Sequence, residues 1–110
     1  MKLYISGPIT GMKDGNKLVF AAAAERLRAA GYIVTNPHDI GAQSGYQNGL
    51  RWSDYLRQDL IYILTCGVTG IATLPGHHTS RGATLECHLA NELDLPVGPE
   101  EFWLKLSKEK

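Results

Sequence analysis

The sequence predicts a single α/β domain built on a parallel β-sheet. Two features of the chain lead to this fold class. Short apolar runs alternate with longer stretches of helical periodicity, and Gly, Pro or Asn stands where the two patterns meet. Strands that alternate with helices at this spacing form βαβ units, whose strands pair in parallel. A chain of 110 residues has the size of one domain, and its 44% of hydrophobic residues can supply a core.

Four short apolar runs are predicted as strands because each is bounded by turn-forming residues. They are residues 3–6, 32–35, 68–74 and 95–97. The first run ends at Gly7 and the second at Asn36, each followed by a proline. The third contains Gly70, which weakens its strand pattern.

Four longer segments are predicted as helices, at residues 17–30, about 50–65, 80–93 and from 99 onward. Gly31 is suited to end the first helix, and Ser80 is suited to cap the start of the third. The segment 36–49, with glycines at 41, 45 and 49, is predicted as a loop. Residues 1–106 are expected to form the single domain, and residues 107–110 a polar, solvated tail.

The charge balance excludes two classes of partner. Lys and Arg together number 11, as do Asp and Glu, so no basic surface for nucleic acid or an anionic membrane is expected. The uncharged stretch 60–80 is interrupted by glycines and a proline, so it is not predicted to span a membrane. The apolar start is too short for a signal peptide, and Cys66 and Cys87 suit reduced thiols, so a cytoplasmic protein is expected.

Two acidic residues stand on the apolar side of their predicted helices. At about 100° per residue, Asp59 and Glu86 each fall in the middle of an apolar stripe. The stripe around Asp59 consists of Trp52, Tyr55, Leu56, Tyr62, Ile63 and Cys66. A buried carboxylate without a partner costs several kcal/mol, which favours a functional role for both. The alternative is that each helical frame is off by one or two residues, or that each acid caps a loop.

The sequence contains candidates for a metal site and for aromatic stacking on a base. The ligands of a metal site would come from His77, His78, His88 and the two cysteines, but their spacing fits no common ligand pattern, so no metal is expected. Three aromatic residues are candidates for stacking on a base: Tyr46, Trp52 and Tyr55. Ligands of parallel α/β sheets bind at the carboxyl ends of the strands, which directs attention to the loops 7–16, 36–49 and 75–80.

Three motifs together resemble those of a known enzyme superfamily. They are Tyr-Ile-Ser-Gly-Pro-Ile-x-Gly at residues 4–11, Arg-x-Asp-Leu at 57–60, and Leu-Pro-Gly-x-x-x-Ser-x-Gly-Ala-x-Leu-Glu at 74–86. The chain resembles the nucleoside 2-deoxyribosyltransferase superfamily from residue 3 to about 103, and is most similar to a short branch found in phages and bacteria. That superfamily also contains the 2'-deoxynucleoside 5'-monophosphate N-glycosidases.

The resemblance implies a flavodoxin-like three-layer sandwich with a four- to five-stranded parallel sheet. It implies that Glu86 is the nucleophile, that Asp59 is the acid for the leaving base, and that Tyr4 orients Glu86. A sugar and phosphate site is implied around Ser6, Gly7, Ile9, Gly11, Ser80 and Gly82. The implied substrate is a small nucleoside or nucleotide, no cofactor is expected, and the chain is expected to form a homodimer or a higher homo-oligomer.

The expected reaction is cleavage of an N-glycosidic bond, or base exchange, through a glutamyl-glycosyl intermediate. Many relatives carry Asp where this chain has residues 66–69, and some carry a basic residue where it has Thr10. Lys13, Arg51 and Arg81 are candidate substitutes for that basic residue, although a solvated surface charge is the more ordinary interpretation of each. Two alternatives stay open: a non-catalytic nucleotide-binding or sensing module, and a phosphoribohydrolase of the cytokinin-activating type.

Overall fold

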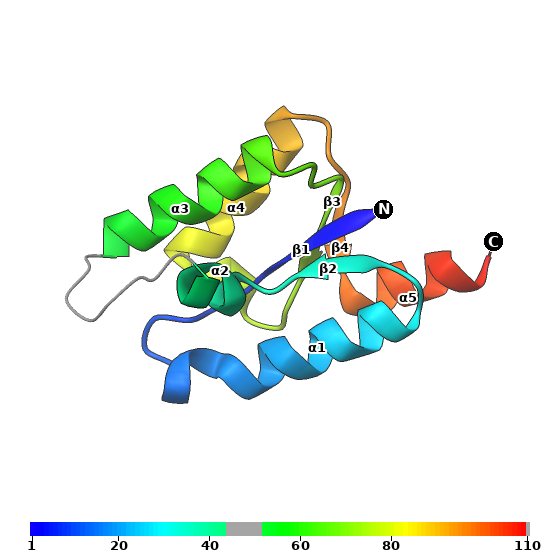
Figure 1. Ribbon diagram of the computed structural model, residues 1–110, viewed down its shortest axis with the longest axis horizontal. Helices are drawn as coiled ribbons and strands as arrows, with labels where there is room; N and C mark the ends of the chain where they lie inside the picture. Colours follow the sequence, from blue (N-terminus) through cyan, green and yellow to red (C-terminus); the bar gives the residue numbers. More distant parts are fainter. Residues whose placement is uncertain (44–51, 110) are drawn as a thin grey trace.

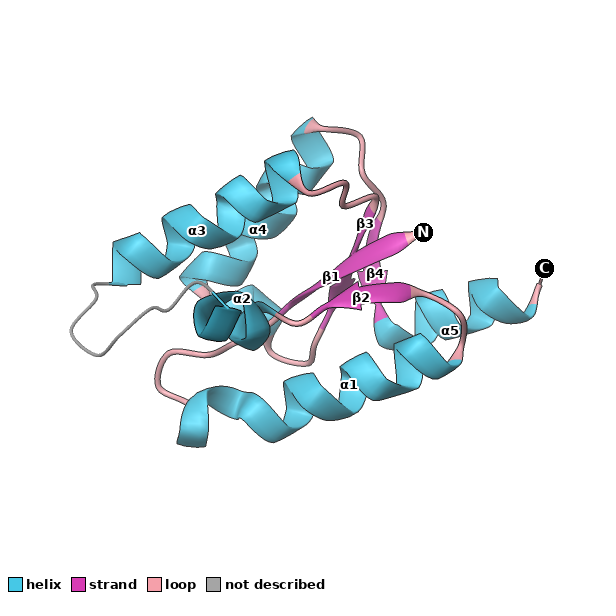
Figure 2. Ribbon diagram, in the orientation of Figure 1, coloured by secondary structure: helices cyan, strands magenta, loops and turns pink. Residues whose placement is uncertain are grey.

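The computed structural model describes residues 1–43 and 52–109, and it confirms the α/β fold with an all-parallel sheet (Figures 1 and 2). The sheet has four strands in the order β2-β1-β3-β4. Their bounds are β1 Lys2–Ser6, β2 Ile33–Thr35, β3 Gly70–Thr73 and β4 Val97–Pro99. In the register of the central strands, Tyr4 lies beside Thr35 on one side and Ile71 on the other.

Helices cover both faces of this sheet, as in a flavodoxin-like three-layer fold (Figure 1). Within the described residues they are α1 Lys17–Ala29, α2 Pro37–Gln43, α3 Trp52–Thr65, α4 Arg81–Glu92 and α5 Glu100–Lys108. Helices α1 and α5 pack against one face, while α2, α3 and α4 contribute to the core on the other. None of these described helices has the length and apolarity needed to cross a membrane.

The core beneath α1 and α5 is organised around Trp103, whose side chain is fully buried. Its indole N–H donates to the carbonyl oxygens of Ile71, at 3.0 Å, and Gly98, at 3.1 Å. A Cβ atom on Gly70 would lie 2.7 Å from Cη2 of Trp103. The glycine that weakened the strand pattern is therefore required there, because a side chain would displace the indole.

Several boundaries differ from the sequence prediction. The expectation of a loop over residues 36–49 is wrong for residues 37–43, which form α2; proline is favoured at the first position of a helix because its φ angle is already helical. The third strand is shorter than expected, and the fourth begins two residues later. Helix α5 continues into the expected tail, where Ser107 Oγ donates to the Ala30 carbonyl oxygen at 2.7 Å.

Candidate active site

The carboxylate of Glu86 is held by two hydroxyl groups from strand β1. Tyr4 donates to Oε2 at 2.6 Å, and Ser6 donates to Oε1 at 2.7 Å. Tyr4 and Ser6 are two residues apart, so they project from the same face of the strand. Both are fully buried, and Glu86 is 5% exposed. Each oxygen of this carboxylate therefore has a donor within the protein.

The local sequence of α4 explains why Glu86 points inward. Ser80 caps the helix, and its hydroxyl oxygen accepts a hydrogen bond from the backbone N–H of Ala83 at 3.2 Å. Ala83 and Ala90 lie three residues before and four residues after Glu86, and all three are buried on one side of the helix. The predicted inward orientation of Glu86 is thus confirmed.

Helix α3 places Asp59 in the same cavity, with its side chain partly buried. The apolar stripe expected around Asp59 is only partly buried. Ile63 packs in the core, but Trp52 is 36% and Tyr55 41% exposed, and Cys66 is also exposed. The helical phase was right for Asp59, but the first part of α3 lines a cavity instead of packing on the sheet.

Burial changes the protonation of the three central groups. Desolvation raises the pKa of Glu86 to about 8 and that of Asp59 to about 7, and it raises the pKa of Tyr4 well above its usual value. The hydrogen bonds from Tyr4 and Ser6 oppose the rise for Glu86, and the Tyr4 hydroxyl also interacts with Asp59 and opposes the rise there. Two carboxyls around one hydroxyl titrate as a pair, so near neutral pH this pair keeps a proton.

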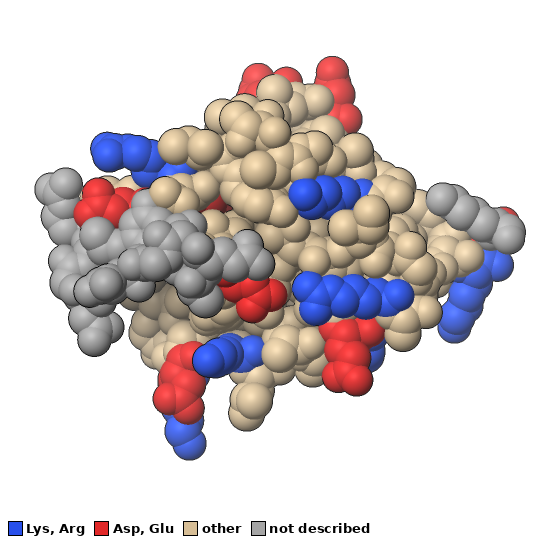
Figure 3. All heavy atoms as spheres, viewed as in Figure 1, with Lys and Arg blue, Asp and Glu red and all other residues tan. Residues whose placement is uncertain are grey.

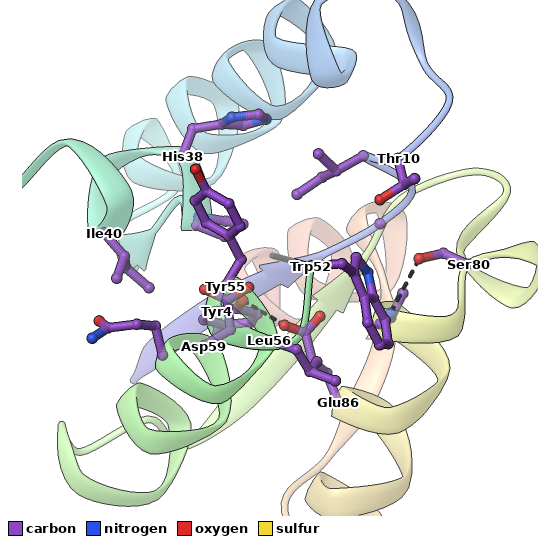
Figure 4. Close-up of a pocket in the computed structure, with 16 residues that line it drawn as sticks. Tyr4, Thr10, His38, Ile40, Trp52, Tyr55, Leu56, Asp59, Ser80 and Glu86 are labelled. Carbon is purple, nitrogen blue, oxygen red and sulfur yellow. Dashed lines mark hydrogen bonds between the residues drawn. The ribbon is translucent and has the colours of Figure 1, made fainter. Parts of the chain in front are cut away.

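These residues surround a cavity of about 400 Å³, a volume typical of small-molecule sites (Figure 4). Seven of the predicted site residues line it: Tyr4, Gly7, Ile9, Asp59, Ser80, Gly82 and Glu86. Ser6 is not among the lining residues, because its hydroxyl is directed at Glu86 from within the protein. Gly11 is exposed and does not line the cavity.

Helix α2 contributes residues that the sequence analysis missed. Pro37, His38 and Ile40 line the cavity; segment 36–49 was expected to contribute to the site, but as a loop and with no residue of it assigned to substrate binding. Nε2 of His38 lies 3.0 Å from the carbonyl oxygen of Gly15, which can only accept, so Nε2 carries the hydrogen. Burial lowers the pKa of His38 and favours the neutral ring. A proline directly after the asparagine was the signal that could have indicated a helix start.

Aromatic side chains form one wall of the cavity. Trp52 and Tyr55 both line it; in the view of Figure 4, Trp52 lies between Glu86 and Ser80, and Tyr55 lies between Asp59 and His38. The guanidinium carbon of Arg81 is 4.4 Å from the centre of the Trp52 ring, a distance typical of cation–π contacts. The other candidates, Tyr46 and Arg51, lie outside the described residues.

Residues 66–69, the segment in which the motif resemblance implies an aspartate, directly precede β3. The Thr69 hydroxyl there accepts a hydrogen bond from the backbone N–H of Lys2 at 2.9 Å. None of these four residues lines the cavity, which lies at the opposite end of the strands.

The candidate metal ligands are not brought together. Across residues 1–43 and 52–109, no group of three or more His, Cys, Asp or Glu side chains is placed to hold a metal ion. His77 and His78 line a second, more open cavity at the ends of β3 and β4.

A family model described as "Domain of unknown function (DUF4406)" matches residues 1–98. Comparison of the chain with curated proteins finds no match, and comparison with solved structures finds none either.

Proposed function

We propose that this chain, which belongs to the family described as Domain of unknown function (DUF4406), breaks the N-glycosidic bond of a nucleoside, a deoxynucleoside or a 5'-monophosphate of either. The observation that carries the proposal is the buried Glu86 carboxylate, held by Tyr4 and Ser6 in a cavity that also contains Asp59. The motif resemblance to the nucleoside 2-deoxyribosyltransferase superfamily supports the class of substrate. Water or a second base completes the reaction.

Glu86 is the proposed nucleophile. Departure of the base leaves positive charge on the sugar ring, which a carboxylate stabilises and can trap as a glycosyl ester. The donors Tyr4 and Ser6 favour the ionised form of Glu86, and they hold its side chain in one orientation. The positive charge on the sugar in the transition state further favours ionised Glu86. The proton that the pair of carboxyls keeps near neutral pH is then held by Asp59.

Asp59 is the proposed proton donor to the leaving base. A carboxyl with a pKa of about 7 is protonated in a large fraction of molecules near neutral pH, as a general acid requires. The Tyr4 hydroxyl interacts with both Asp59 and Glu86, and all three side chains line the same cavity. Glycosidases that work through a covalent intermediate likewise use two carboxyls, one as the nucleophile and the other as the acid.

The walls of the cavity suit a nucleoside or its monophosphate. Trp52 and Tyr55 offer aromatic faces on which a base can stack. Ser80, Gly82 and Ala83 place the amino end of α4 at the cavity, where the helix dipole favours an anion. A phosphate on the sugar would be stabilised there.

A second copy of the chain is the proposed partner. Four large apolar side chains on α3, on α4 and directly after α4 remain between 43% and 55% exposed: Ile61, Leu64, Leu85 and Leu93. Covering them would remove apolar surface from water, which favours association. Light scattering after size exclusion is expected to give twice the chain mass or more, and a purely monomeric protein would contradict this part of the proposal.

A reducing, cytoplasmic location is also proposed, because both cysteines carry free thiols. Fractionation of cells that make the protein is expected to recover it with the cytoplasmic proteins.

The decisive experiment incubates purified protein with 2'-deoxynucleosides, ribonucleosides and their 5'-monophosphates and measures free base by chromatography. Release by wild type and its loss in Glu86→Gln would support the proposal. Intact-mass measurement after reaction with a 2'-fluorinated substrate should reveal an adduct on Glu86. Release from ribonucleotides alone would favour a phosphoribohydrolase. Binding in a thermal-shift assay without release of base would instead favour a nucleotide-binding module.

A further inference from the structure

The two oxygens of the Glu86 carboxylate occupy different surroundings. Oε2 accepts from Tyr4, which lines the cavity, and this bond is drawn in Figure 4. Oε1 accepts from Ser6, which is fully buried and does not line the cavity. A substrate in the cavity therefore meets Oε2, while Oε1 is held from the protein interior.

The geometry points to Ser6 as a positioning residue for Glu86. By holding Oε1, its hydroxyl directs Oε2 at the anomeric carbon of the sugar. The same hydrogen bond accelerates breakdown of the ester that forms between Glu86 and the sugar. This inference rests on the proposed function. It differs from the role that the motif resemblance implies for Ser6, which is a place in the sugar and phosphate loop.

The first step makes the two oxygens chemically distinct. A lone pair of Oε2 forms the bond to the anomeric carbon, while the bond from that carbon to the base nitrogen breaks. Its electron pair stays with the base, which takes the proton of Asp59. Oε1 becomes the carbonyl oxygen of the ester and still accepts from Ser6.

The second step restores the carboxylate. A water oxygen attacks the anomeric carbon, and ionised Asp59 takes the water proton. The bond between the anomeric carbon and Oε2 breaks, and its electron pair returns to Glu86, where the charge spreads over Oε1 and Oε2. Asp59 and Glu86 are thereby returned to their starting states.

Ser6 affects these two steps in opposite directions. A hydrogen bond to a carboxylate is stronger than one to a neutral ester carbonyl. The Ser6 bond therefore weakens as the ester forms and strengthens as the ester breaks, and only an interaction that strengthens toward a transition state accelerates that step. Ser6 is expected to favour the second step over the first.

The test compares Ser6→Ala with wild type by rapid quenching, using whichever 2'-deoxynucleoside or 5'-monophosphate of the four common bases the wild type cleaves fastest. Loss of the bond to a charged group should slow ester breakdown by about 10- to 100-fold. One equivalent of base should appear in a burst, and intact mass should show the ester accumulating on Glu86. The matched control is Thr73→Val, a buried residue that pairs with Ser6 in strand β3, which should show no such burst.

A second readout does not depend on turnover. Because the Ser6 hydrogen bond lowers the pKa of Glu86, Ser6→Ala should move the carbon-13 titration of the Glu86 carboxyl to higher pH, and Thr73→Val should leave it in place. If wild type releases base but Ser6→Ala leaves the ratio of the rates of ester formation and ester breakdown unchanged, the role of Ser6 is overturned. An unchanged titration of Glu86 in Ser6→Ala would overturn it as well. In both cases the proposed function stands. A wild type that cleaves none of the substrates overturns the proposed function, and the kinetic role of Ser6 with it.

Discussion

The phenolic hydroxyl of Tyr4 donates a 2.6 Å hydrogen bond to Oε2 of Glu86, although 82 positions separate the two residues in the chain. Both side chains are buried, so this bond forms away from bulk water. It favours the ionised carboxylate and fixes the direction of Oε2.

Tyr4→Phe removes the hydroxyl and keeps the ring. Because Glu86 then loses a donor to its charged form, kcat/KM for base release should fall by about 10- to 100-fold. Tyr32→Phe is the matched control, since the buried Tyr32 hydroxyl donates at 2.6 Å to the Trp103 carbonyl oxygen in the core beneath α1 and α5. Equal loss of activity in both variants would contradict a specific role for Tyr4.

Stability should depend on pH through the raised pKa values of Glu86 and Asp59. In the unfolded chain both carboxyls ionise near their ordinary values, so between about pH 4 and 8 the folded protein holds more protons than the unfolded one. The free energy of unfolding therefore falls as pH rises through this range. The melting temperature should therefore be higher at about pH 5 than at about pH 9.

Glu86→Gln isolates the contribution of Glu86, because an amide does not ionise. Calorimetry should show a shallower decrease of melting temperature with pH than in wild type, so that the variant gains relative stability in alkaline solution. Glu92→Gln, at an exposed position of the same helix, should follow the wild-type curve. Parallel curves for wild type and Glu86→Gln would show that Glu86 is not held protonated in the folded protein.

Asp59→Asn should slow base release most for substrates whose leaving base needs a proton. With ordinary deoxynucleosides kcat should fall by about 10²- to 10⁴-fold, as for loss of a general acid. With 7-methyl-2'-deoxyguanosine the loss should be much smaller, because that base is already cationic and departs without protonation. Free base is measured by chromatography for both substrates. Equal losses would assign Asp59 a role other than proton donation.

Much of this site could be predicted from the periodicity of the sequence. The 3.6-residue period placed Asp59 and Glu86 on the inner sides of their helices, and the cavity-lining Asp59 and buried Glu86 agree with it. The period of two along β1 is what brings Tyr4 and Ser6 to one face. Such patterns are local, so a single sequence shows them.

The pairing of these groups could not be derived in the same way. The Tyr4 and Ser6 bonds to Glu86 depend on where α4 crosses β1, which no local pattern specifies. His38 was not identified as a cavity residue and its helix was not predicted, because Asn-Pro and the nearby glycines resemble a loop. The exposure of Trp52 and Tyr55 was missed because an apolar stripe indicates a buried face without distinguishing a core from a cavity.

Arg81→Gln should distinguish monophosphate from nucleoside substrates. Arg81 follows the capping Ser80 and lies against the face of Trp52, which brings a positive charge to the mouth of the cavity. If a 5'-phosphate binds at the amino end of α4, kcat/KM should fall by about tenfold for the monophosphate and remain unchanged for the nucleoside. Arg57→Gln, at an exposed position of α3, is the control. An equal effect on both substrates would exclude phosphate recognition by Arg81.

Substitutions at two glycines should separate stability from binding. A Cβ atom on Gly82 would lie 3.9 Å from Leu56 Cδ1 and 4.0 Å from Trp52 Cζ2, which are ordinary contacts, and alanine favours a helix. Gly82→Ala should therefore keep or raise the melting temperature while its methyl group narrows the cavity and raises KM.

Gly70→Ala should lower the stability and leave KM unchanged. Its Cβ would lie 2.7 Å from Cη2 of Trp103, in the core on the other face of the sheet. The resulting displacement of the indole should cost about 1–3 kcal/mol of unfolding free energy, measured by denaturant titration. The fraction that stays folded should keep the wild-type KM, since Gly70 and Trp103 are outside the cavity lining. A raised KM in Gly70→Ala, or a wild-type KM in Gly82→Ala, would contradict the assignment of this cavity as the substrate site.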